Sequence, residues 1–133
     1  MADAFELKSL APILLVERIE PCLPFWVEQL GFALVTTVPE QSPFVFAIVA
    51  RGGVEIMLQT TASAAEDMGG ATAEVRESIL YLSVGSLDAV LGAVGDAEIL
   101  VPRRTTFYGA DEVWVRAPGG TVVGFSAAAV GQQ

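Results

Sequence analysis

A chain of 133 residues, 53% of them hydrophobic and 17% charged, can bury one hydrophobic core, and this composition excludes an intrinsically disordered segment. The net charge of −9, with a single lysine at Lys8, argues against a nucleic-acid partner. No apolar run approaches the roughly 20 residues of a membrane span, and the absence of histidine removes Ser-His-Asp and Cys-His triads and histidine-based zinc sites.

The N-terminal segment and the single cysteine indicate the compartment. Residues 1–10 contain no basic segment that leads into a long apolar stretch, so we expect no secretory signal. Cys22 cannot form an intramolecular disulfide, and without a histidine partner we expect it to be a packed, inert thiol. A cytoplasmic location is therefore expected.

The first half of the chain predicts a β-α-β-β-β order. Pro21 suits a first helical turn, the apolar residues after it recur at helical spacing, and Gly31 is a natural C-cap. Clusters of turn residues separate the β-rich runs that follow. The predicted elements are a buried strand over 11–17, a helix between Pro21 and Gly31, and strands over 32–38, 44–50 and 54–59.

Residues 60–76 are small, polar and glycine-containing. Such a composition is typical of a linker or a flexible flap rather than of a core element, with a helical turn at 62–67 as an additional feature.

The second half of the chain repeats the order of the first. Ser86 is a natural N-cap for a helix whose apolar residues share one face. The predicted elements are a strand over 79–84, a helix over 86–94, and strands over 97–102, 112–117 and 121–127.

This repeated order, with a Gly-Gly turn before the last strand of each half, indicates an internally duplicated unit. We expect a single domain, residues 1–133, of the α+β class, with two tandem βαβββ modules that form curved mixed sheets around a cleft. The modules span about 10–60 and about 77–127, with a linker over 61–76, and residues 103–109 form a loop over the cleft.

Three stretches resemble the vicinal oxygen chelate superfamily, which includes glyoxalases, extradiol dioxygenases and fosfomycin- and bleomycin-resistance proteins. The stretches are FWVEQLGF after the first helix, VEIMLQ after the first Gly-Gly, and YGADEVWVRAPGG near the C-terminus. Members often carry (F/W)Y…LGF where this chain has the residues 25–32, and DPxGN where it has 117–121. The likeness covers about residues 10–127 and implies the glyoxalase/bleomycin-resistance fold.

Enzymes of that superfamily place metal ligands at four strand positions. In this sequence the positions fall at Ala11, at Glu55, near Ile79 and at Gly124, which leaves room where a ligand would protrude. One carboxylate without an imidazole cannot hold a divalent ion against water. The resemblance therefore implies the metal-free, bleomycin-resistance-like branch, with no metal and no cofactor, whose members bind a drug without chemistry, usually as homodimers with pockets at the subunit interface.

Alternation of side chains along the strands, together with the resemblance, predicts which residues face the cleft. Tyr81 and Trp114 are expected to stack on a planar ligand. Glu55 and Glu112 are expected to attract a cationic one, and Arg116 to pair with one of these carboxylates. The predicted ligand-binding residues are Glu55, Met57, Gln59, Tyr81, Arg104, Phe107, Tyr108, Glu112, Trp114 and Arg116.

Some of these residues have an ordinary structural role as the alternative. Glu55 is then a residue at an exposed sheet edge, and Trp114 a core or dimer-contact residue. For Tyr81 a position in the core and one in the pocket are equally expected. For Met57 the same holds for filling irregular space and for lining the pocket. Trp26, on the helix, is expected to pack in the core.

The favoured function is metal-independent binding of a small aromatic or cationic molecule, with sequestration of an antibiotic as one form of it. The partners expected are this ligand and a second copy of the chain, with no nucleic acid and no membrane. The alternative is a lyase, isomerase or dioxygenase of the same superfamily that uses Glu55 as metal ligand or general base. A third reading is a dimerisation module whose cleft is filled by its own side chains.

Overall fold

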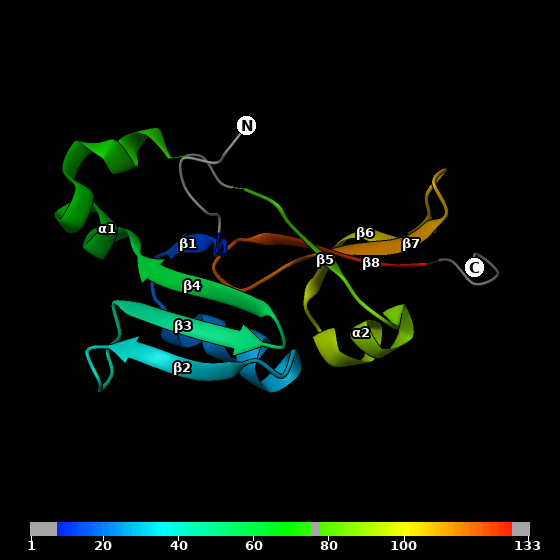
Figure 1. Cartoon of the computed structure of the whole chain (residues 1–133), viewed down its shortest axis with the longest axis horizontal. Coiled ribbons are helices and arrows are strands. Elements are labelled where there is room, and N and C mark those ends of the chain that lie inside the picture. The colour runs from blue at the N-terminus through cyan, green and yellow to red at the C-terminus, as the bar shows by residue number, and fades with distance from the viewer. Residues whose placement is uncertain (1–7, 76–77, 129–133) are drawn as a thin grey trace.

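The computed structural model describes residues 8–75 and 78–128 of the chain and contains two βαβββ modules. Each module builds one four-stranded sheet, with the strand orders β1-β4-β3-β2 and β5-β8-β7-β6. In both sheets the first strand of the module pairs in parallel with the last, and all other pairs are antiparallel. The α+β fold of tandem modules predicted from the sequence is confirmed, and Figure 1 shows the two modules side by side.

The first module follows the predicted order. Its helical segment consists of a 3-10 turn and a π-helix, in which the amide of Leu30 donates to the carbonyl of Phe25, 3.0 Å away. The predicted Pro21 lies in the first turn of this segment. The elements are β1 (Ile13–Val16), η1 (Glu20–Cys22), η2 (Pro24–Gln29), β2 (Ala33–Val38), β3 (Phe46–Arg51) and β4 (Val54–Thr60).

The connection between the modules is helical. It contains α1 (Thr61–Met68) and the 3-10 segment η3 (Gly69–Glu74), which include the helical turn expected at 62–67. The hydroxyl of Thr60 caps α1 by accepting a hydrogen bond from the amide of Ser63, at 3.1 Å. This cap explains why a small, polar stretch forms a helix where its composition alone predicts a linker.

In the second module, Ser86 is the N-cap of its helix, as predicted, and its hydroxyl accepts from the amide of Ala89 at 3.1 Å. The predicted loop over 103–109 is wrong in its first part, because residues 103–105 continue a strand, and only 106–109 form a turn. The elements are β5 (Leu80–Ser83), α2 (Leu87–Val94), β6 (Glu98–Thr105), β7 (Ala110–Arg116) and β8 (Val122–Ala128).

One hydrophobic core joins both modules. Trp26 is completely buried there, as predicted, and meets the rings of Phe25 and Phe32 edge-to-face. Cys22 is also buried, and burial raises the pKa of its thiol, consistent with an inert role.

Contacts on the helix side fix one module against the other. The side-chain amide of Gln29 donates to the carbonyl of Val94 on α2, at 2.8 Å. At Gly119, which has a φ of +94°, an added Cβ would lie 2.8 Å from Cγ1 of Val16 and 3.0 Å from Sγ of Cys22. The turn before β8 therefore packs directly on the first module, at a position that only glycine fits.

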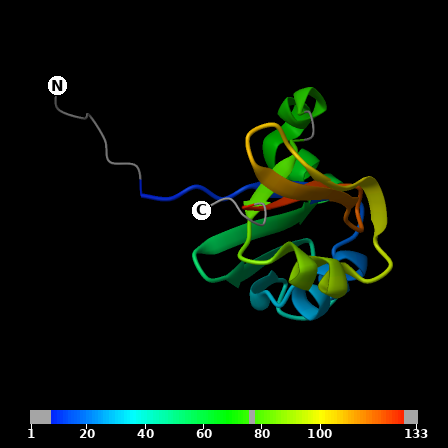
Figure 2. The same cartoon turned by 90° about the vertical axis from the view of Figure 1, so that its right-hand side faces the viewer.

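Each sheet has one face covered by helices and one face uncovered. Figure 1 shows η2 behind the first sheet and α2 below the second, so the two uncovered faces point in different directions rather than toward each other. Residues 8–10 lead away from the body of the molecule (Figure 2), whereas Pro12 already accepts a hydrogen bond from the amide of Met57 on β4, at 2.9 Å. In the described part of the chain, no helix has the length and apolarity that crossing a membrane requires.

Candidate ligand-binding site

Tyr81, Gly124 and Trp114 form one row across the uncovered face of the second sheet. Gly124 on β8 is in register with Tyr81 on β5 and with Trp114 on β7. The residues before and after them, such as Val113 and Phe125, point to the opposite face and are buried in the core. Strand alternation thus places both predicted stacking residues on the uncovered face.

The indole of Trp114 covers Gly124. A Cβ added to Gly124 would lie 2.7 Å from Cε3 and Cζ3 of this ring and 2.8 Å from Cη2. The expectation that Gly124 leaves open room is therefore wrong, because the indole takes up that space. Trp114 also stacks on Tyr81, with ring centroids 5.5 Å apart and an interplanar angle of 29°. The two rings make a flat aromatic platform that crosses three strands.

Glu112 lies beside this platform and is only 2% exposed, because its own hydrogen-bond donors cover it. Its Oε1 accepts from the hydroxyls of Tyr81 at 2.9 Å and Tyr108 at 3.2 Å. Its Oε2 accepts from Nε1 of Trp114 at 2.9 Å, and from Nε and Nη2 of Arg104 at 3.1 and 2.8 Å. The indole N–H and then the Arg104 guanidinium lower the pKa of Glu112 to about 2, against the opposing effect of burial.

These bonds give Glu112 a different role from the predicted one. A carboxylate offers about four lone-pair sites, and five donors already occupy them. Glu112 is thus an ionised group that orients two tyrosines, a tryptophan and an arginine, and it does not present a free negative charge. Arg104, not Arg116, is its ion-pair partner.

Arg116 pairs with Glu98, with Nε 3.4 Å from the carboxylate, and donates to the carbonyl of Gly120. The predicted pairing of Arg116 with Glu55 or Glu112 is therefore wrong. Arg104 keeps a 56% exposed side chain, and its Nη1 makes no hydrogen bond with any residue that the structure describes.

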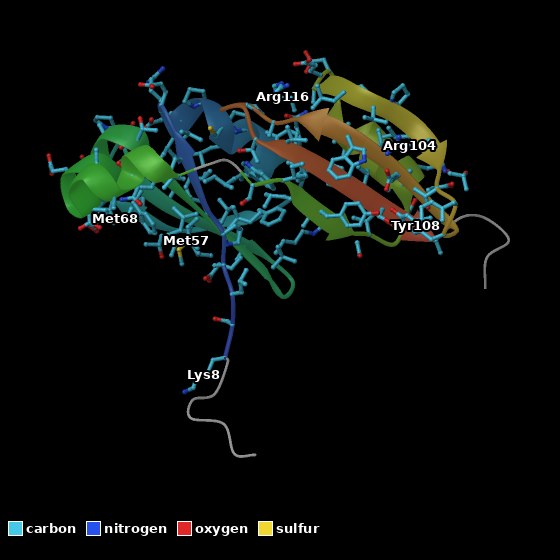
Figure 3. All side chains as sticks on the ribbon, turned by 90° about the horizontal axis from the view of Figure 1, so that it is seen from above. Lys8, Met57, Met68, Arg104, Tyr108 and Arg116 are labelled. Atoms are coloured by element: carbon cyan, nitrogen blue, oxygen red, sulfur yellow. The ribbon has the colours of Figure 1, made fainter. Side chains whose placement is uncertain are left out.

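The turn between β6 and β7 carries two exposed aromatic side chains. Phe107 is 99% exposed at its tip, and Tyr108 packs edge-to-face against it with ring centroids 5.0 Å apart. The hydroxyl of Tyr108 ties this turn to Glu112. Figure 3 shows Tyr108 and Arg104 together at this end of the second sheet.

Three predicted residues lie on the other sheet. Glu55, Met57 and Gln59 alternate along β4 on its uncovered face, while Ile56 and Leu58 between them are buried, as predicted. The amide of Gln59 donates to the hydroxyl of Ser63 on α1, at 3.2 Å. Met57 is in register with Ile13 and Ile48, so this face is largely aliphatic.

Glu55 is exposed, and within residues 8–75 and 78–128 it takes part in no hydrogen bond or ion pair. It lies on the first sheet and Trp114 on the second, so one chain does not bring the two together (Figure 1).

The structure thus divides the ten predicted residues into groups. Six form one cluster on the second sheet: Tyr81, Arg104, Phe107, Tyr108, Glu112 and Trp114. Arg116 lies further along β7, and the other three lie on β4. A cavity of about 480 Å³ lies between the modules on the helix side, and none of the ten residues lines it.

The positions that correspond to metal ligands do not fit a metal. Ala11 and Ile79 have no ligating atom in their side chains, and Gly124 lies under the indole of Trp114. Within the part of the chain that the structure describes, no three His, Cys, Asp or Glu residues come together as a metal would require.

Sequence reasoning missed the ion pair of Arg104 with Glu112 and the packing of Trp114 on Gly124. The signal for the pair is present, since Arg104 and Glu112 lie on either side of a short turn and become cross-strand neighbours once β6 extends to Thr105.

Comparison with known proteins gives structural neighbours only. No protein-family model matches the sequence, and no curated protein does either. TioX from Micromonospora sp. ML1 superposes with a TM-score of 0.74 at 18% identity, over 91% of this chain and 98% of that one. A glyoxalase/bleomycin resistance protein/dioxygenase family enzyme from Burkholderia phytofirmans PsJN gives 0.71 at 19% identity, over 89% and 96%. Lactoylglutathione lyase from Agrobacterium tumefaciens gives 0.69 at 12% identity, over 90% and 92%. The chain therefore has the fold of the glyoxalase, bleomycin-resistance and dioxygenase proteins.

Proposed function

We propose that the protein binds a small planar aromatic molecule without a metal, on the platform that Tyr81 and Trp114 form. The observation that carries this proposal is the position of the Trp114 indole, which lies over Gly124 and stacks on a half-exposed Tyr81. A partly exposed pair of stacked rings is a surface on which another flat ring packs well, at about 0.5–1.5 kcal/mol beyond the burial of area.

The platform is held in place before any ligand arrives. The indole N–H of Trp114 and the hydroxyl of Tyr81 both donate to Glu112, which fixes the position of each ring on the sheet face. A rigid surface loses little conformational entropy when a ligand binds, so more of the contact energy remains as affinity. This arrangement supports binding rather than chemistry, since the carboxylate nearest the platform has no lone pair left to act as a base.

The occupied space above Gly124 supports binding without a metal. In the enzymes that the sequence resembles, a ligating carboxylate comes from this position on the last strand. Here any side chain at 124 would collide with the indole, whose nearest atom is 2.7 Å from an added Cβ. The aromatic platform thus replaces one wall of a metal site.

A second copy of the chain completes the site in this proposal. One chain presents the platform on an open face, where Ile79 is 62% exposed and Tyr81 46% exposed. The aliphatic face around Met57 is also uncovered, and Ile13 beside it is half exposed. Apolar faces of this kind mark interaction sites, and the two faces of one chain point in different directions. A homodimer that covers the platform of one chain with the aliphatic residues Ile13 and Met57 of the other would enclose the ligand and sequester it.

The test is binding of aromatic antibiotics and simpler fused-ring compounds to protein freed of metal by a chelator. We expect binding by calorimetry and its loss in Trp114→Ala, while Trp26→Phe, a change confined to the core, leaves the affinity unaltered. Molar mass from light scattering measures the dimer in the same samples. Binding that needs added metal, or that survives in Trp114→Ala, would contradict the proposal.

A further inference from the structure

We propose that this site selects planar aromatic ligands that carry a carboxylate or another acceptor at one edge, and discriminates against cationic ones. The inference rests on the proposed binding function and names its ligand class. Its basis is that the acidic groups of the second sheet are consumed by internal partners, while Arg104 keeps an exposed, unused donor beside the platform.

The carboxylates on β6 and β7 are all paired. Glu112 is saturated by five donors, and Asp111 on the opposite face accepts from the hydroxyl of Thr105 at 2.7 Å and pairs with Arg103. Glu98 pairs with Arg116. A ligand ammonium at the platform therefore finds no free carboxylate on these strands, and it would have to displace a donor from Glu112 to gain one.

Arg104 is placed to meet an acceptor. Its Nε and Nη2 hold Oε2 of Glu112, the same oxygen that accepts from Trp114, so the guanidinium lies at the edge of the platform. Its Nη1 has no partner among the described residues, and the side chain is 56% exposed. A ring stacked on Trp114 can thus extend an edge oxygen toward this group, in the planar geometry that guanidinium favours.

The net charge of −9 does not reverse this preference. At physiological ionic strength the Debye length is about 8 Å, so remote carboxylates are largely screened, whereas a hydrogen-bonded contact is not. A cation–π contact on an exposed ring favours a cation by roughly two- to fivefold. A charge-assisted hydrogen bond from Arg104 favours an anion by about tenfold or more, and therefore dominates.

Three probes on one scaffold test the inference: 2-naphthoate, 2-naphthamide and 2-naphthylmethylamine, which are anionic, neutral and cationic at neutral pH. We expect the affinities measured by calorimetry to decrease in that order, with naphthoate about tenfold tighter than the amine. Equal affinities, or tighter binding of the amine, would overturn the inference and leave the proposed function intact. If none of the three binds up to millimolar concentration, the proposed platform itself fails.

Two variants assign the preference to one side chain. Arg104→Gln should reduce the affinity for naphthoate about tenfold while that for naphthamide changes little. Arg116→Gln, which removes the same charge further along β7, should leave the order of the three probes unchanged. Near-ultraviolet circular dichroism reports whether the Tyr81–Trp114 stack persists in both. A preference that survives in Arg104→Gln, or an equal loss for all three probes, would contradict the assignment.

Discussion

Replacing Gly124 with alanine tests the packing of the platform. The change should lower the free energy of unfolding when Trp114 is present and raise it when Trp114 is replaced. An added Cβ would lie 2.7 Å from two atoms of the indole, and the ring cannot move freely while its N–H is bound to Glu112 and it packs beside Tyr81. Overpacking of this kind costs about 1–3 kcal/mol, so we expect Gly124→Ala to lower the free energy of unfolding by that amount.

In a Trp114→Ala background the same change should be stabilising. The backbone of Gly124 has no left-handed φ, so alanine fits it, and the substitution reduces the entropy of the unfolded chain, a gain of about 0.4–1 kcal/mol. The coupling energy between the two sites is therefore roughly 1.4–4 kcal/mol. Urea unfolding, followed by the fluorescence of the buried Trp26, measures the free energy of unfolding of the wild type, the two single variants and the double variant.

The control for this double-mutant cycle is Gly92→Ala on α2. An added Cβ there meets nothing within 4 Å, so its effect should be the same with and without Trp114. If Gly124→Ala has an equal effect in both backgrounds, the indole does not occupy the space above Gly124, and the reasoning from this contact is refuted.

Three further predictions follow from single residues. Because the folded-state pKa of Glu112, about 2, is below its ordinary value of 4.5, its contribution to stability is complete above pH 4.5 and is lost as the pH falls toward 2. Acid unfolding curves of the wild type should show this loss of stability as the pH falls from 4.5 toward 2, and those of Glu112→Gln should not. Gly119→Ala should destabilise the fold by about 2 kcal/mol or more in urea, because its Cβ would collide with Val16 and Cys22 at a left-handed φ; a loss under about 0.5 kcal/mol would contradict that packing. Phe107→Ser should change the free energy of unfolding by less than about 0.5 kcal/mol, since this side chain is 99% exposed, yet weaken dimerisation measured by sedimentation; unchanged dimerisation would exclude Phe107 from the interface.

The order of elements could be predicted from the sequence because local signals agree with the fold. The cap at Ser86, the alternation of Glu55 and Met57 with the buried Ile56 and Leu58, and the repeated Gly-Gly turns each report on a few neighbouring residues. Such signals do not depend on how distant segments pack.

The interior of the site could not be predicted in the same way. Pro102 and the polar run after it read as the end of a strand, whereas cross-strand bonds from residues 103–105 to Asp111 and Glu112 extend β6 to the turn. Alternation places Trp114 on the correct face but does not say that its ring leans over Gly124.

Sequence patterns also do not predict the relative orientation of the two sheets. It depends on tertiary contacts such as Gln29 with Val94, which are 65 residues apart. As a result, the residues predicted to line one site lie on two separate faces, one aromatic and one aliphatic.

The most direct test of metal-free aromatic binding is calorimetric titration of 2-naphthoate into chelator-treated wild type and Trp114→Ala, with and without a divalent metal. We predict binding to the wild type that is independent of metal and absent from Trp114→Ala. Binding that appears only with metal, or that is equal in the two proteins, would contradict the assignment of this surface as the ligand site.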